Sequence, residues 1–177
     1  MSTRVRERVY AWVGVVVVII SALALTGAVI IQQIIAGQNT SQTPPALACT
    51  DSDAEPTYPA PEKYLPAGTV SDLQQTDITV GTGQTAKAGD CLVVKYYGTL
   101  ASDGTKFDEN YTTPNAFAFT LGQGQVIQGW DQGLVGMKVG GERRLVIPAS
   151  LAYGSTGSGS IPANSTLVFY VRLLKIK

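Results

Sequence analysis

A stretch of 21 residues near the N-terminus contains no charged side chain and constrains the fold more than any other feature of the chain. It runs from Ala11 to Ile31 and reads AWVGVVVVIISALALTGAVII. A helix of that length is roughly 30 Å long, which matches the hydrocarbon thickness of a bilayer. The sequence therefore predicts a membrane-spanning helix, which we assign to residues 11–36.

Basic residues lie on only one side of this stretch. Arg4, Arg6 and Arg8 precede it, and no further Lys or Arg occurs before Lys63. The positive-inside rule then predicts a cytoplasmic N-terminus, residues 1–10, and an extracytoplasmic remainder in a single-pass cell-membrane protein. The alternative is a cleaved signal peptide, whose apolar core is usually about 7–15 residues long. The longer stretch favours an uncleaved signal anchor.

The tripeptide Leu47-Ala48-Cys49 resembles a lipoprotein cleavage box. It lies well beyond the apolar stretch, and Ala46 occupies the position where Leu is usual. Lipidation is therefore not favoured.

Residues 37–67 are rich in Pro, Ser, Thr and Ala and poor in large aliphatic side chains. Such a composition cannot bury a core, so it predicts a flexible, partly extended linker. Cys49 lies in this segment, and the only other cysteine is Cys91. In an exported region the two could form a disulfide. They could equally be isolated thiols, with Cys91 buried in a strand.

The overall composition excludes several classes of function. The chain has 13 basic and 13 acidic residues, whereas a nucleic-acid binder normally has a basic surplus. It has no histidine, which removes His-dependent nucleophiles and His-ligated metal sites. Two cysteines cannot make a four-cysteine zinc site. Any catalysis is therefore expected to work without a metal or another cofactor.

Residues 68–177 have the pattern of a folded α+β domain. CLVVKYYGTL, residues 91–100, is apolar, β-branched and aromatic, which predicts a strand. GERRLVIP predicts another strand, with Arg143 and Arg144 on a solvated face. The C-terminal segment places Leu167, Phe169, Val171 and Leu173 on one face of a third strand. One short helix is expected at about 126–135, and core positions are expected at Phe119, Leu145, Val171 and Leu173.

Many other large side chains occur at the ends of predicted elements or in loops, where binding residues concentrate. An apolar, aromatic-lined cavity with few polar groups is typical of a ligand site. The candidates for one concave face are Tyr96, Phe107, Asp108, Phe117, Phe119, Val126, Ile127, Trp130, Tyr153, Ile161, Pro162 and Phe169.

Three stretches together closely resemble the FKBP-type peptidyl-prolyl cis-trans isomerases: VVKYYGTLASDGTKFDEN, FTLGQGQVIQGWDQGLVGMKVGGERRLVIPASLAYG and IPANSTLVFYVRLLKIK. With the N-terminal anchor, the chain resembles a membrane-anchored, bacterial-like form. The resemblance implies a twisted antiparallel β-sheet wrapped around one short α-helix, preceded here by the transmembrane helix and the linker. It also implies a pocket between the sheet and the helix, with Trp130 at its floor.

The resemblance implies roles for the pocket residues. Catalytic roles fall on Tyr96, Asp108, Trp130, Tyr153 and Phe169. Substrate-binding roles fall on Phe107, Phe117, Val126, Ile127 and Ile161. The implied partners are proline-containing polypeptides of exported or membrane-associated proteins, the membrane through the N-terminal helix, and macrolide inhibitors. Two alternatives are a non-catalytic, proline-binding chaperone module on the cell surface and a structural surface domain with a collapsed pocket.

The chain departs from the family pattern beside Asp108. Well-studied members carry an Arg shortly after the Phe-Asp pair, but ENYTTPNA, residues 109–116, has no basic side chain. We therefore expect the Tyr96 hydroxyl to be the partner of Asp108. The loop GSTGSGSI, residues 154–161, is also one residue shorter than in the small cytosolic type, and Ser158 replaces the His of some members.

Overall fold

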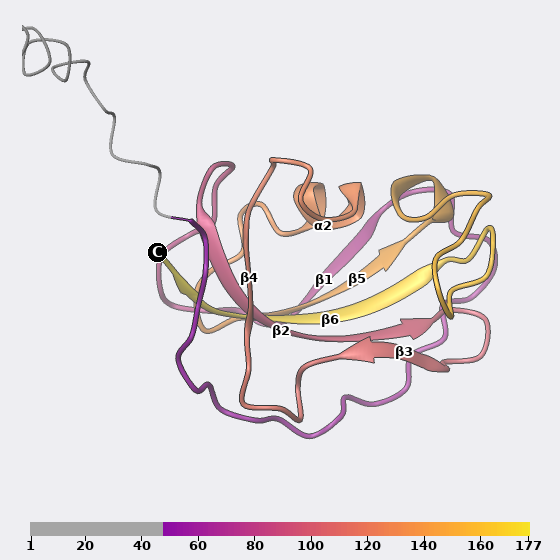
Figure 1. Cartoon of the computed structure of the whole chain (residues 1–177). Coiled ribbons are helices and arrows are strands. Elements are labelled where there is room, and N and C mark those ends of the chain that lie inside the picture. The colour runs from indigo at the N-terminus through magenta and orange to yellow at the C-terminus, as the bar shows by residue number, and fades with distance from the viewer. Residues whose placement is uncertain (1–47) are drawn as a thin grey trace, which may run out of the picture. The chain divides into compact units, whose positions relative to one another are not determined.

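The computed structural model describes residues 48–177, which form one compact unit built around a six-stranded sheet (Figure 1). The strands are β1 (Gln74–Thr79), β2 (Cys91–Leu100), β3 (Lys106–Glu109), β4 (Phe117–Thr120), β5 (Glu142–Ile147) and β6 (Leu167–Ile176). The helical elements are α2 (Gln128–Gly133) and the 3₁₀ helix η1 (Ala149–Leu151). The predicted antiparallel sheet with one short α-helix is confirmed.

Strand β2 is the element that brings the site together. The strand order is β1-β5-β6-β2-β3, and β4 also pairs with β2. The first half of β2, Cys91–Val94, pairs with β4, and residues 97–99 pair with β3. Every pairing is antiparallel. Because β2 has the predicted bounds 91–100, Tyr96 lies between the segments that carry Asp108 and Phe117.

The main core lies between α2 and the inner face of the sheet. Successive strand residues point to opposite faces, so Leu167, Phe169, Val171 and Leu173 of β6 all enter this core. Phe119 and Leu145 are also buried there, as predicted. Val168 and Tyr170 point to the outer face, where they form a second cluster with Val70, Tyr111 and Val146.

Helix α2 is shorter than the predicted 126–135, and two glycines seat it on the sheet. Ile127 is extended (φ −59°, ψ 148°), so the helix begins only at Gln128. A Cβ on Gly129 would lie 2.4 Å from Ile147 Cγ2, and one on Gly133 would lie 2.8 Å from Leu145 Cδ2. Only residues without a side chain permit this approach. The extended Val126 and Ile127 are left to line a cavity.

The prediction of a flexible linker is wrong for residues 48–67. Tyr58 and Tyr64 pack against the second cluster, and the Tyr170 hydroxyl donates a 3.1 Å hydrogen bond to the Glu62 carbonyl. Cys49 and Cys91 form a disulfide, which decides between the two alternatives for these residues. In Figure 1 this indigo and purple segment passes along the side of the sheet opposite α2. The tyrosines supply the apolar surface that a Pro-rich, aliphatic-poor composition otherwise lacks.

The predicted N-terminal elements, residues 1–10, 11–36 and 37–47, lie outside the residues that the structure describes. Within residues 48–177, no helix is both long enough and apolar enough to cross a membrane.

Arg143 and Arg144 do not form a solvated face, contrary to the prediction. Arg143 is buried, and its guanidinium pairs with the Asp77 carboxylate, with Nε 2.6 Å from Oδ1. Its Nη1 donates to the carbonyls of Gly133 (2.9 Å) and Val135 (3.1 Å) at the end of α2. Arg144 points to the opposite face, with its guanidinium carbon 3.6 Å from the Tyr64 ring centroid. Arg143 therefore ties the edge strand β1 and the helix to β5.

The adjacent arginines offer a matched pair of substitutions. Arg143→Met leaves two helix-end carbonyls and the Asp77 carboxylate without their donor, so we expect it to lower the free energy of unfolding by about 3 kcal/mol. Arg144→Met removes the cation–π contact with Tyr64 and no side-chain hydrogen bond within residues 48–177, so it is expected to cost at most about 1 kcal/mol. Urea denaturation measures both. Equal losses would show that Arg143 is not the tie described above.

Candidate functional site

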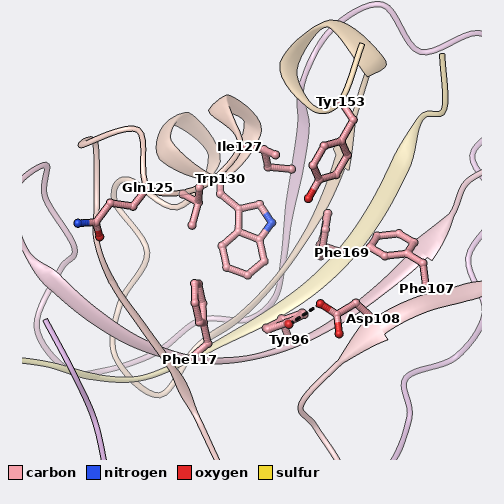
Figure 2. A pocket seen from close by; sticks show the side chains of 10 residues that line it. Tyr96, Phe107, Asp108, Phe117, Gln125, Ile127, Trp130, Tyr153 and Phe169 are labelled. Carbon is pink, nitrogen blue, oxygen red and sulfur yellow. Dashed lines mark hydrogen bonds between the residues drawn. The ribbon is translucent and has the colours of Figure 1, made fainter. Parts of the chain in front are cut away.

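A cavity of about 290 Å³ opens between the start of α2 and the curled sheet (Figure 2). Its lining comes from six parts of the chain: strands β2, β3, β4 and β6, the entry and first turn of α2, and the residues that follow η1. Strand β6 closes it from behind. The lining residues are Tyr96, Phe107, Asp108, Phe117, Gln125, Val126, Ile127, Trp130, Tyr153 and Phe169.

Four aromatic rings form the inner wall of the cavity, and they meet edge to face. Trp130, 4% exposed, lies 5.2 Å from Phe169 and 5.4 Å from Tyr96 between ring centroids, with interplanar angles of 85° and 76°. Phe107 meets Phe169 at 5.4 Å and 82°. This is the preferred packing geometry of aromatic pairs. The wall is therefore a fixed surface on which a small apolar ring can lie.

Gly98 makes this packing possible from the sheet side. It belongs to β2, and a Cβ at this position would lie 2.7 Å from Phe107 Cζ and 2.8 Å from Phe169 Cε1. Any side chain at residue 98 would push these rings into the cavity. The glycine is explained by this close approach rather than by a turn.

The polar side of the cavity is a hydrogen-bonded pair. The Tyr96 hydroxyl donates to Asp108 Oδ2 at 2.6 Å, which confirms the expected partner of Asp108. The Asp108 Oδ1 atom accepts from the Glu109 amide at 2.9 Å. Burial, together with the Asp108 hydrogen bond and charge, raises the pKa of Tyr96 above its usual value. The phenol therefore remains a neutral donor at physiological pH.

Three further donors belong to residues that line the cavity. The Tyr153 hydroxyl points into it in Figure 2. The Ile127 amide makes no hydrogen bond to any other group within residues 48–177. The buried Trp130 Nε1 also has no partner in this part of the chain. Carbonyl oxygens of an extended peptide are the natural acceptors for the Tyr153 hydroxyl and the Ile127 amide, so the arrangement suits binding of a peptide with one apolar ring.

The structure brings together nine of the ten predicted pocket residues around this cavity. The exception is Ile161, which is 8% exposed, belongs to the main core and pairs with Ser158 in an isolated bridge. Gln125 also lines the cavity but was not predicted; its Oε1 accepts a hydrogen bond from the Thr120 amide at 2.8 Å. The only sequence feature that could have indicated Gln125 as a pocket residue was its position next to Val126.

A curled antiparallel sheet that holds an aromatic cavity against one short helix defines a class of peptide-binding domain. Within this chain, residues 82–174 match the family FKBP-type peptidyl-prolyl cis-trans isomerase. The match covers more than half of the chain, so the protein belongs to this family. The predicted enzyme class, prolyl cis-trans isomerase, is confirmed at the level of the family.

Relatives with this domain are mostly longer proteins. The chain is 57% identical over 108 residues to FK506-binding protein 4 of Gibberella zeae, covering 61% of this chain and 21% of the relative. It is 48% identical over 115 residues to a peptidyl-prolyl cis-trans isomerase of Saccharomyces cerevisiae, covering 65% and 26%. The chain thus spans about a fifth to a quarter of these relatives. Both are eukaryotic, so they do not support the bacterial-like form.

Two solved structures share the fold. The crystal structure of AtFKBP13 has a TM-score of 0.55 and 36% identity, covering 59% of this chain and 93% of that one. The crystal structure of FkpA from Escherichia coli has a TM-score of 0.55 and 47% identity, covering 59% of this chain and 48% of that one.

Proposed function

We propose that this cavity catalyses the cis-trans isomerisation of X-Pro peptide bonds. One observation carries the proposal: an apolar floor at Trp130 faces a hydrogen-bonded Tyr96–Asp108 pair across a cavity of about 290 Å³. The chain's membership of the isomerase family supports it. The substrate is a proline-containing polypeptide, whose ring lies on the indole of Trp130.

The reaction needs no bond to break. Rotation about an amide bond is opposed by a barrier of roughly 18–20 kcal/mol, because the planar amide loses resonance as it twists. An enzyme accelerates rotation by binding the twisted amide more tightly than the planar one. The twisted amide is less dipolar than the planar one, so removing it from water costs less free energy. An apolar cavity therefore favours the twisted state.

The aromatic wall and the hydrogen-bond donors contribute to catalysis in different ways. Tyr96, Phe107 and Phe169 line the cavity, and their ring C–H edges each contribute a weak interaction with the rotated carbonyl oxygen. The Ile127 amide and the Tyr153 hydroxyl bind carbonyls of the peptide on either side of the proline. They hold the chain while the bond turns, which is a contribution of positioning. The Tyr96–Asp108 bond keeps the phenol ring in place.

Exchange NMR on a short X-Pro peptide tests the proposal with residues 48–177, which form a compact unit, and with the full chain. We expect acceleration from both. Trp130→Leu removes the flat floor and Asp108→Val removes the acceptor of the Tyr96 hydroxyl, so each is expected to lower kcat/KM at least about tenfold.

The control is Val135→Thr, an exposed position at the other end of the helix (46% exposed), which is expected to leave kcat/KM unchanged. Peptide binding by a folded wild-type domain without acceleration would favour the binding module. No peptide binding would favour a structural domain with an unused cavity.

We further propose that the full chain is a membrane-anchored, bacterial-like form that acts on exported or membrane-associated proteins and is sensitive to macrolides. Support comes from the uncharged stretch 11–31, the three arginines before it, and the likeness to FkpA. Relatives named for FK506 binding motivate the macrolide part. The full chain should sediment with membranes and residues 48–177 should not; a full chain that remains in the supernatant would contradict the anchor.

A further inference from the structure

The loop of residues 110–116 joins two parts of the cavity. It begins after Asp108 in β3 and ends at Phe117 in β4, and both residues line the cavity. Asp108 pairs with Gly98 and Phe117 pairs with Val94, so the loop connects two strand ends that are both attached to β2 and both flank the cavity. We therefore expect the position of the loop to affect the width of the cavity on its open side.

A buried lysine fixes this loop to the sheet. The Lys95 side chain of β2 is fully buried, and its amine donates to the carbonyls of Asn110 (3.2 Å), Asn115 (2.9 Å) and Thr113. The Asn110 side chain accepts from the Tyr96 amide at 2.6 Å. The loop is thus bound to the same strand residue whose hydroxyl holds Asp108. All these hydrogen bonds join β2 to the loop.

A second layer of contacts comes from the segment before the sheet, residues 48–64, which we call the arm. Its Glu55 amide donates to the Pro114 carbonyl and its Tyr58 amide donates to the Tyr111 carbonyl, both at 2.8 Å. The rings of Tyr58 and Tyr111 lie 5.8 Å apart. Figure 1 shows the arm passing beside the β3–β4 connection. Two backbone hydrogen bonds therefore connect the arm to the loop.

Covalent and ionic contacts fasten the arm itself. The Cys49–Cys91 disulfide fixes its start to the first residue of β2. Asp51 pairs with Lys177 at 2.6 Å, and Glu55 pairs with Lys175 at 2.6 Å. Burial opposes ionisation of Asp51, but hydrogen bonds and charges from Lys177 and Lys175 outweigh it and lower the pKa of Asp51.

The acidic groups of the arm are committed to these lysines. The carboxylates of Asp51, Asp53 and Glu55 lie within 4.8 Å of one another, close enough for a cation site. The Lys175 amine is within ion-pair distance of all three. The three carboxylates are therefore better explained as partners in ion pairs with Lys175 and Lys177 than as a metal site.

We propose that the arm is a positioning element of the isomerase cavity, fastened by the Cys49–Cys91 disulfide. By holding loop 110–116 it fixes Phe117 opposite Asp108 before a peptide arrives. A loosened arm leaves the Trp130 floor in place but lets the open side of the cavity widen. The affinity for peptide then falls while the turnover of bound peptide changes little. The effect on catalysis rests on the proposed function; the effect on the loop does not.

The test compares the wild-type chain with the double variant Cys49→Ser, Cys91→Ser. Amide hydrogen exchange reports the loop, and we expect the Glu55 and Tyr58 amides, together with loop 110–116, to exchange at least about tenfold faster in the variant. For an X-Pro peptide, KM is expected to rise about fivefold with kcat within about twofold. Dithiothreitol should have the same effects on the wild-type chain and none on the double variant, which is the matched control.

Lys95→Met provides a second variant, because it loosens the loop without touching the disulfide. It is expected to raise KM in the same way while Glu55 and Tyr58 lose less protection than in the cysteine variant. Unchanged loop exchange in a folded cysteine variant would overturn the proposal, whatever the activity. Faster loop exchange with an unchanged KM would also overturn it. A wild-type chain without isomerase activity would instead contradict the proposed function, and the exchange data would still decide whether the arm holds the loop.

Discussion

The packing of Trp130 between the helix and the sheet is the interaction on which the site depends. The indole has to be buried deeply enough to remain fixed and yet present one surface to the cavity. Glycines 129 and 133 bring the helix close to the sheet. Gly98 leaves room for Phe169, which meets the indole, and for Phe107, which meets Phe169. The cavity is the space that these rings leave open, so the position of its inner wall follows from close approach of the backbone.

The outer face of the sheet is as specifically organised as the inner one. Tyr58 lies over Arg172, with 4.1 Å between the guanidinium carbon and the ring centroid, and Tyr64 lies over Arg144 in the same way. The Tyr111 hydroxyl donates to Glu142 at 3.0 Å, and Glu142 in turn pairs with Arg172. Burial, together with the charge of Glu142, raises the pKa of Tyr111 above its usual value. This layer connects the arm with the loop that carries pocket residues at both ends.

The local pattern of apolar residues was sufficient to predict the bounds of strand β2 and the core positions of β6. Each is a run of apolar and β-branched residues whose alternation shows which face is buried. The pocket residues followed from the family resemblance, since no single aromatic residue distinguishes a cavity from a core. Ile161 shows the limit of that transfer, because it is buried in the main core and does not line the cavity.

Features that depend on distant partners could not be read from the local sequence. Arg143 looks like half of a solvated pair, but its partner Asp77 is 66 residues away in an edge strand. The arm has the composition of a linker, yet Cys49 finds its partner 42 residues further on, and Glu62 meets Tyr170 after 108 residues. Helix α2 is shorter than its pattern because the extended Ile127 lines the cavity instead of continuing the helix.

The most direct test of this account is the position of a bound proline. Isotope-filtered NMR on residues 48–177 with an X-Pro peptide would record nuclear Overhauser effects between the peptide and the protein. The account predicts contacts from the proline ring to the Trp130 indole, and from the residue before it to the Tyr96 and Phe169 rings. Contacts confined to the exposed side of Phe117, with none to Trp130, would contradict the claim that the aromatic cavity is the site.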